Sequence, residues 1–252
     1  MTEFIAPPCA EQISILYQDE HLLLINKPSG LLSLSGKNPL NKDSVHYRLV
    51  QDFPTATLVH RLDFGTSGIM LVALNKTING QLTKQFQDKT INKRYHAVLH
   101  GHLSDELQSL GAINAAIAKD LDNFPYMKIC SDTGKQALTE FEVIEESFVN
   151  ANANANVGAS INVYANISVN VNAEKSEQKV PVTRVKFTPI TGRTHQLRIH
   201  SQHIGHPILG CDLYRNAISE TLASRLLLHA SYLSFTHPVI GIRFEIDCDI
   251  PF

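Results

Sequence analysis

The chain has 252 residues, of which 43% are hydrophobic and 18% charged, a balance typical of a folded protein with a sizeable core. It contains no run of 18 apolar residues, no basic stretch leading into an apolar N-terminal segment, and no cysteine pair in C-x-x-C spacing. These features argue against a membrane span, a secretory signal, a disulfide framework and a metal site, and they favour a cytoplasmic protein. The formal net charge of -2 gives no general attraction to a polyanion.

Apolar runs of strand length recur along the chain, and three stretches have apolar residues at helical spacing instead. The predicted strands cover residues 13–17, 21–26, 68–74, 91–100, 138–144, 181–189 and 226–235. The predicted helices cover residues 44–53, with Asp43 or Ser44 as N-cap, 77–89 and 194–203. Because strands outnumber helices and do not alternate regularly with them, we predict an α+β fold. Its central sheet would be mixed, mostly antiparallel and flanked by helices.

One segment between two predicted strands has an unusual composition. Residues 150–172 hold eight Asn, with Ala and Val between them and no Lys or Arg. Asn disfavours the interiors of helices and strands, so we interpret this segment as a low-complexity insertion that lengthens a hairpin. The rest of the chain is predicted to be a single domain, 13–252, preceded by a short tail, 1–12.

The segment His60–Gly68, HRLDFGTSG, places charged residues and tight-turn residues directly before a buried strand. A rigid element that presents a polar loop in this way is typical of a catalytic site. Asp63 has no other carboxylate between Asp52 and Asp88, so paired-carboxylate chemistry is not indicated. A lone Asp beside Arg61 suggests an ionised nucleophile or base, and the alternative is an Asp that only closes the loop.

Basic residues gather in two places despite the negative net charge. Residues 76–95 hold five cations against one acid, and residues 184–225 hold six cations against two acids. In the second patch Arg193 and Arg198 could bind phosphate, or one of them could neutralise Asp63. In the first, Tyr95 follows two cations, an arrangement that suits a base stacked on a ring with phosphates nearby. Local patches of this kind are an electrostatic footprint for nucleic acid.

Taken together, these segments resemble the RluA family of RNA pseudouridine synthases. The resemblance is carried by HRLD and TSG in 60–68, GRTHQLR at 192–198, NKPSG at 26–30 and GHPI at 205–208. It covers nearly the whole chain except the ends and the Asn-rich insertion. The S4-type RNA-binding domain of many members does not fit here, because the first matching strand begins near Ile15. One departure is Cys211, which stands where the family usually has Asp after Gly210.

The resemblance implies the pseudouridine synthase fold, with the active site in a central cleft. Asp63 would be the catalytic carboxylate, and Arg193 would pair with it and keep it ionised. Tyr95 would stack on the flipped uracil, Arg61 would fill the gap left by the flipped nucleotide, and Leu228 would form an apolar wall. The residues expected to contact RNA phosphates are Arg198, Lys84, Lys89, Lys93 and Arg184.

The implied reaction is the isomerisation of a uridine to pseudouridine without cofactor or metal. The expected targets are position 32 of the tRNA anticodon loop and position 746 of 23S ribosomal RNA, modified by a monomer. Two alternatives remain at this point. The chain could be an RNA-binding protein without catalysis, or a synthase that acts on a different rRNA or tRNA uridine.

Overall fold

The computed structural model describes residues 4–151 and 179–252 of the chain. Apart from Asn150 and Ala151, the Asn-rich insertion predicted at 150–172 lies outside the described residues. Within the described ranges, no helix is both long enough and apolar enough to cross a membrane.

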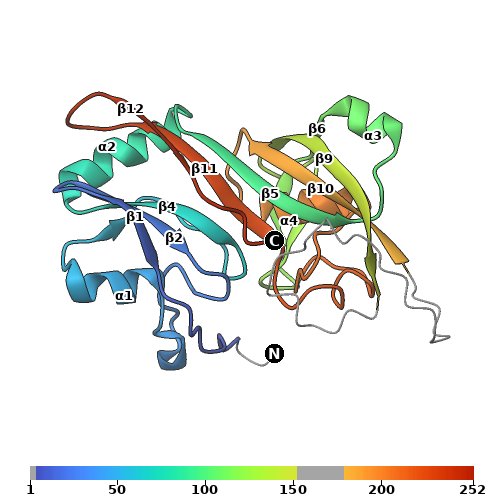
Figure 1. The fold of residues 1–252 in the computed structure, drawn as a ribbon, viewed down its shortest axis with the longest axis horizontal. Helices are drawn as coiled ribbons and strands as arrows, with labels where there is room; N and C mark the ends of the chain where they lie inside the picture. The colour runs from blue at the N-terminus through green and yellow to red at the C-terminus, as the bar shows by residue number, and fades with distance from the viewer. Residues whose placement is uncertain (1–3, 152–178) are drawn as a thin grey trace, which may run out of the picture.

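A large sheet forms the centre of the molecule (Figure 1). Its strands follow the order β1-β2-β4-β11-β5-β10-β9-β6, with β3 beside β4 and β12 beside β11, while β7 and β8 form a separate hairpin. The strands are β1 (Ser14–Gln18), β2 (Leu22–Lys27), β3 (Thr57–Leu58), β4 (Ser67–Ala73), β5 (Asn92–His100), β6 (Ala112–Asn114), β7 (Ile117–Lys119), β8 (Met127–Ile129), β9 (Leu138–Asn150), β10 (Lys179–Pro189), β11 (Leu228–Thr236) and β12 (Arg243–Asp247).

The pairing of these strands confirms the predicted mixed, mostly antiparallel sheet. Among the described residues, every pairing in the large sheet is antiparallel except that of β4 with β11. The register of β9 on β10 runs from Asn150 opposite Lys179 to Thr139 opposite Pro189, so both strands are longer than predicted. The two arms on either side of the Asn-rich segment therefore form an antiparallel hairpin, as the sequence suggested.

Four α-helices and one 3₁₀ turn accompany the sheet in the described part of the chain. They are η1 (Pro39–Asn41), α1 (Val45–Asp52), α2 (Lys76–Gln87), α3 (Asp105–Leu110) and α4 (Gln196–His203). Ser44 caps α1, because its hydroxyl accepts a hydrogen bond from the Tyr47 amide. The last helix begins two residues later than predicted, since His195 has φ +55° and cannot belong to a right-handed helix.

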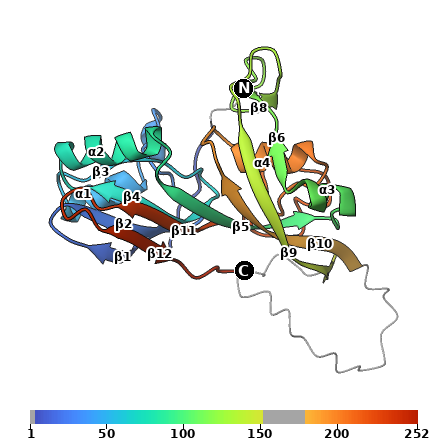
Figure 2. The ribbon, with the colours of Figure 1, turned by 90° about the horizontal axis from the view of Figure 1, so that it is seen from above.

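The two halves of the sheet meet where the long strands β5 and β11 run side by side (Figure 1). Figure 2 shows α2 over the half formed by β1, β2, β4, β11 and β12, and α4 beside the half formed by β9, β10 and β6. Separate apolar clusters fill the space under each helix layer. The junction between the halves is thus the place where loops and helices of both can form a common site.

Candidate active site

A cavity of about 460 Å³ lies at this junction. One wall is the loop that follows His60, and the opposite wall is the segment from Thr191 to Arg198. Tyr95 of β5 and Leu228 of β11 line it between the two walls. This volume lies in the range of pockets that hold a small-molecule group such as a nucleotide base. The cavity lining includes Asp63, Tyr95, Arg193, Leu228 and Arg61, the residues that the resemblance assigns to the site, and their roles remain predictions.

The loop that carries Asp63 is held from behind through its main chain. The Ser33 hydroxyl donates to the Leu62 carbonyl at 2.6 Å and accepts from the Leu62 amide at 3.2 Å. The Ser29 hydroxyl donates to the Gly65 carbonyl at 2.7 Å, and the Gly30 amide donates to the Phe64 carbonyl at 3.0 Å. Polar groups of the segment after β2 thus hydrogen-bond to the loop backbone on both sides of Asp63, and these bonds fix the backbone at Asp63.

The strongest of these anchors is Lys27, a lysine with no exposed surface. Its Nζ donates to the carbonyls of Pro28 (2.9 Å), Phe64 (3.1 Å) and Thr66 (2.8 Å). An ammonium has three donors, and here all three are used on loop carbonyls. Burial lowers the pKa of Lys27 to about 7. This residue connects the end of β2 to the part of the loop that follows Asp63.

Gly68 allows the strand after the loop to reach the centre of the sheet. It has φ +114° and lies opposite Ala230, where β4 pairs in parallel with β11. A Cβ atom at this position would lie 2.3 Å from the carbonyl oxygen of Ala230. Only glycine fits so close an approach of two backbones, which explains why a glycine ends the HRLDFGTSG segment.

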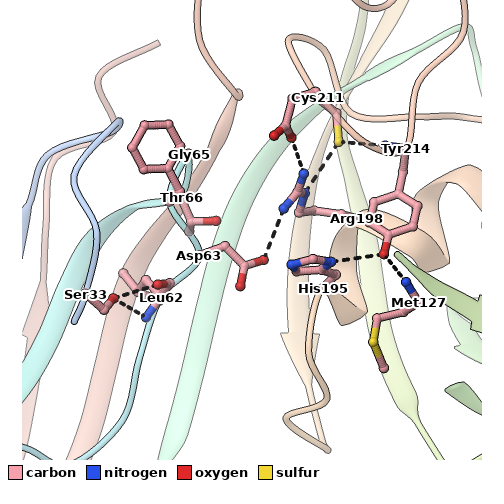
Figure 3. A network of polar contacts seen from close by, with 12 residues as sticks. Ser33, Leu62, Asp63, Gly65, Thr66, Met127, His195, Arg198, Cys211 and Tyr214 are labelled. Carbon is pink, nitrogen blue, oxygen red and sulfur yellow. Dashed lines mark hydrogen bonds and ion pairs between the residues drawn. The ribbon is translucent and has the colours of Figure 1, made fainter. Parts of the chain in front are cut away.

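Asp63 faces a buried arginine across the pocket, and this arginine is Arg198 (Figure 3). The Arg198 Nη1 lies 3.5 Å from the Asp63 Oδ2, and the Arg198 side chain is 4% exposed. The prediction that Arg193 pairs with Asp63 is therefore wrong. Arg193 is exposed at the pocket rim, and its Nε donates to the Gln136 carbonyl at 2.9 Å. The late start of α4 places Arg198, in the first turn of the helix, toward the cleft.

Three further residues complete the environment of the Arg198 guanidinium. Its Nη2 forms an ion pair and hydrogen bond with Asp212, and its Nε donates to the Cys211 Sγ at 3.4 Å. The guanidinium carbon also lies 5.5 Å from the ring centre of Tyr214. A buried charge is stable only when it is paired and hydrogen-bonded, and these contacts provide that. Cys211, the departure from the family pattern, thus contacts the arginine of the site.

Tyr95 and His60 form the wall between α2 and β5. Burial and the nearby Asp63 carboxylate raise the pKa of Tyr95, so its hydroxyl stays protonated at neutral pH. The His60 Nε2 accepts a hydrogen bond from the Leu71 amide at 3.0 Å, and its ring lies 4.8 Å from the Phe86 ring. Burial, together with Lys93, lowers the pKa of His60 to about 3, so this imidazole is neutral.

The opposite wall is organised by one buried amide, Gln196. Its Oε1 accepts from the Thr191 hydroxyl at 2.8 Å and from the Arg193 amide at 2.9 Å. Its Nε2 donates to the Leu138 carbonyl at 3.0 Å and to the Thr139 hydroxyl at 2.9 Å. Gln196 therefore fastens the turn before α4 to the beginning of β9 and fixes the direction in which α4 starts.

The residues predicted to contact phosphate separate into two groups. Arg198 is buried, and the Arg184 Nη1 donates to the carbonyl of the C-terminal Phe252 at 2.7 Å, so the structure does not support the prediction for either. Lys84 and Lys89 are exposed at the end of α2, where Lys84 pairs with Asp88 at 3.0 Å. Lys93 lines the pocket, and burial lowers its pKa. Lys84, Lys89 and Lys93 thus remain candidates for RNA contact.

Sequence reasoning missed several residues that the structure places at the site. The roles of Lys27, Ser33, His195, Gln196, Asp212 and Tyr214 were not predicted. Lys27, His195 and Gln196 belong to the motifs at 26–30 and 192–198, so the family resemblance was the available signal for these three. Ser33, Asp212 and Tyr214 lie outside those motifs. In the described part of the chain, no three side chains of His, Cys, Asp or Glu come together as a metal site requires.

Comparison with known proteins identifies the class to which this fold and pocket belong. The family model for RNA pseudouridylate synthase matches residues 21–203. The chain therefore belongs to the RNA pseudouridine synthase family, whose members are isomerases that act on RNA.

Within this family, relatives named for one particular enzyme are similar over nearly the full chain. The dual-specificity RNA pseudouridine synthase RluA of Yersinia pestis is 42% identical over 238 residues, 94% of this chain and 99% of the relative. The protein of the same name in Escherichia coli (strain K12) is 40% identical over 93% of this chain and 92% of the relative. The structure of human RNA Pseudouridylate Synthase Domain Containing 1 superposes with a TM-score of 0.71 at 29% identity, over 98% of this chain and 86% of that chain. The resemblance inferred from the motifs is thus confirmed.

Proposed function

We propose that this enzyme isomerises loop uridines of tRNA and of 23S ribosomal RNA, with Asp63 as the catalytic carboxylate. One observation carries the proposal. The Asp63 carboxylate lies in a cavity of about 460 Å³ and faces the buried guanidinium of Arg198 at 3.5 Å. An arginine at this distance fixes the direction of the carboxylate in the cavity, as a nucleophile or base requires.

The reaction moves atoms only within the substrate. The N1–C1′ bond of uridine breaks, the uracil turns in the pocket, and a C5–C1′ bond forms. The proton on C5 leaves and N1 gains a proton, so no oxidant, reductant or second substrate is needed. Asp63 starts this sequence by attack on the sugar, attack on the base or removal of a sugar proton. In each case the ion pair with Arg198 holds the carboxylate in place.

The remaining pocket residues would hold the flipped nucleotide. Tyr95 would stack on the uracil. Because its hydroxyl is protonated, it could accept the C5 proton only if it released its own proton at the same time. Leu228, which is 3% exposed, would form the apolar wall under the base. Arg61 is exposed at the rim next to Leu62, which is itself anchored in the core, and would fill the gap in the RNA stack. Flipping costs a few kcal/mol and less in a loop, so a loop uridine is the expected target.

The family resemblance suggests position 32 of the tRNA anticodon loop and position 746 of 23S ribosomal RNA as the two targets. The word dual-specificity in the names of the relatives agrees with two kinds of RNA. We further propose that the enzyme acts as a monomer. Substrates of this kind also support a cytoplasmic location.

An RNA-binding protein without catalysis would need the exposed cations but no ion pair inside a cavity. The test is to incubate the purified protein, without added metal, with an anticodon stem-loop that has a uridine at position 32. We expect conversion of that uridine to pseudouridine, and an unmodified stem-loop would contradict the proposal. Mapping pseudouridine in total RNA from cells with and without the gene then distinguishes the proposed targets from other tRNA or rRNA uridines.

A further inference from the structure

The Tyr214 hydroxyl connects two segments of the pocket wall that are distant in sequence. It accepts a hydrogen bond from the Met127 amide of β8 at 2.7 Å and lies 3.0 Å from the Nδ1 of His195 (Figure 3). Tyr214 is 2% exposed, and its ring packs edge-on against the His195 ring at 5.6 Å. These contacts determine where the protons of Tyr214 and His195 can be.

The Met127 amide is only a donor, so it uses one lone pair of the Tyr214 oxygen. The hydroxyl proton of Tyr214 then needs an acceptor, and the Nδ1 of His195 is the group at hydrogen-bonding distance. If Nδ1 carried the proton instead, the buried Tyr214 hydroxyl would lose this acceptor, at a cost of about 1–3 kcal/mol. Tyr214 therefore donates to Nδ1, and neutral His195 carries its proton on Nε2.

The geometry of His195 directs this second nitrogen into the pocket. In Figure 3 the ring edge opposite the Tyr214 contact faces the side of Asp63 and Arg198. His195 is one of the residues that line the cavity. It also has φ +55°, a left-handed conformation that costs a non-glycine residue energy and that is frequent at functional sites. The chain thus keeps a strained backbone at the residue whose imidazole faces the carboxylate.

We propose that His195 is a further catalytic residue, a neutral donor whose Nε2–H binds a carbonyl oxygen of the uracil, and that Tyr214 positions it. This inference rests on the proposed function, because it needs the uracil next to Asp63. When the N1–C1′ bond breaks, negative charge spreads over the uracil carbonyl oxygens. If Asp63 attacks the base instead, charge develops on a carbonyl oxygen as well. A fixed N–H donor stabilises that charge along each route.

The electrostatic surroundings of His195 agree with a neutral imidazole. Burial lowers the pKa of His195, and the nearby Arg198 lowers it further, while the carboxylates of Asp63 and Asp212 act in the opposite direction. The net shift is downward, so the ring does not gain a second proton at neutral pH. His195 would therefore donate a hydrogen bond without taking part in proton transfer.

Two substitutions of His195 distinguish a role as hydrogen-bond donor from a purely structural role. In His195→Gln the amide nitrogen lies near the place of Nε2, whereas in His195→Asn it lies near the place of Nδ1. Asn tolerates a left-handed backbone better than Gln, so a purely structural role favours Asn. We expect His195→Asn to lower kcat by about 10²-fold, as loss of one oxyanion donor does, and His195→Gln to stay within about tenfold of wild type. KM for a tRNA stem-loop should change little in both, because phosphate contacts dominate affinity.

Tyr214→Phe tests the positioning role, since it removes the hydroxyl and keeps the ring. We expect about a tenfold lower kcat with an unchanged KM, and no further loss when the same change is made in His195→Gln. A kcat for His195→Gln equal to or below that of His195→Asn overturns the inference, as does an additive effect of Tyr214→Phe. Asp63→Asn is measured in parallel. If Asp63→Asn remains active, the proposed function fails rather than the role of His195.

Discussion

The loop that carries Asp63 and the helix that carries Arg198 face each other across the pocket, yet they are held in different ways. Lys27 and Ser33 hold the loop through its backbone carbonyls and amides, so its shape does not depend on the Asp63 side chain. The opposite wall depends on contacts between side chains, such as Arg198 with Asp212 and Gln196 with Thr139. The first wall fixes the position of Asp63. The second wall provides the charged and hydrogen-bonding side chains that face it.

This difference predicts different consequences for substitutions in the two walls. Removal of an anchor behind the Asp63 loop should first lower the free energy of unfolding, because buried carbonyls lose their donors. Removal of the Arg198 side chain from the opposite wall should first lower the rate, because it faces the Asp63 carboxylate.

Among the substitutions that compare the two walls, we expect the largest effect for Arg198 of the second wall, with Arg193 as its matched control. Arg198→Gln leaves Asp63 and Asp212 without their shared cation, so we expect the single-turnover rate to fall by about 10²–10³-fold. Arg193→Gln removes an exposed side chain that donates to the Gln136 carbonyl, and we expect less than about a threefold change. A larger loss for Arg193→Gln than for Arg198→Gln would show that the observed ion pair does not support catalysis.

In the first wall, Lys27→Met keeps the length of the side chain and removes the amino group that contacts three backbone carbonyls. We expect the free energy of unfolding to fall by about 2 kcal/mol, which lowers Tm by about 4–8 °C in a chain of this size. Thermal unfolding at pH 7.5 measures the change, with Lys84→Met on the exposed face of α2 as the control. An unchanged Tm for Lys27→Met would mean that the loop does not need this anchor.

The same lysine predicts how stability depends on pH. Its pKa is about 7 in the folded protein and about 10.4 when unfolded, so between these values only the unfolded chain holds the proton. Stability then rises with pH across this window. We expect the difference in unfolding free energy between wild type and Lys27→Met to grow from pH 7 to pH 10, by at most about 4 kcal/mol. A difference that stays constant or shrinks with pH would contradict the lowered pKa of Lys27 in the folded protein.

The smallest effect concerns the contacts with the RNA backbone. Lys89 is exposed beside α2, whereas Arg184 is tied to the carbonyl of Phe252. We expect Lys89→Gln to weaken RNA binding a few-fold and to reduce the slope of log affinity against log salt by about one. Arg184→Gln should leave that slope unchanged, and the reverse pattern would return Arg184 to the RNA-binding surface.

Much of the fold could be predicted from the sequence because its long strands and helices have clear apolar patterns. The three predicted helices and seven predicted strands all have counterparts in the structure. Strands β6, β7 and β8 were missed because three residues are too few for a period to be seen. Helix α3 was also missed, because it has only six residues and none of them is buried, so its sequence shows no apolar face.

The site could be predicted where a sequence motif marks a residue. It could not be predicted where two residues of the same type, such as two arginines, stand in one motif. Asp63, Tyr95 and Leu228, which the motifs assign to the site, all line the pocket. The choice between Arg193 and Arg198 failed, because the left-handed His195 shifts the start of α4 and the first turn of that helix is buried on all sides. Lys27 also escaped prediction, since a lysine is almost never fully buried and only the structure shows its three carbonyl partners.

The measurement that tests the central claim most directly is a single-turnover assay of Asp63→Asn on an anticodon stem-loop, with RNA binding measured on the same samples. This substitution keeps the size of the side chain and removes its charge opposite Arg198. We predict that RNA affinity stays within about threefold of wild type, because phosphate contacts are untouched, while pseudouridine formation falls by more than about 10³-fold. Turnover within tenfold of wild type would contradict the account.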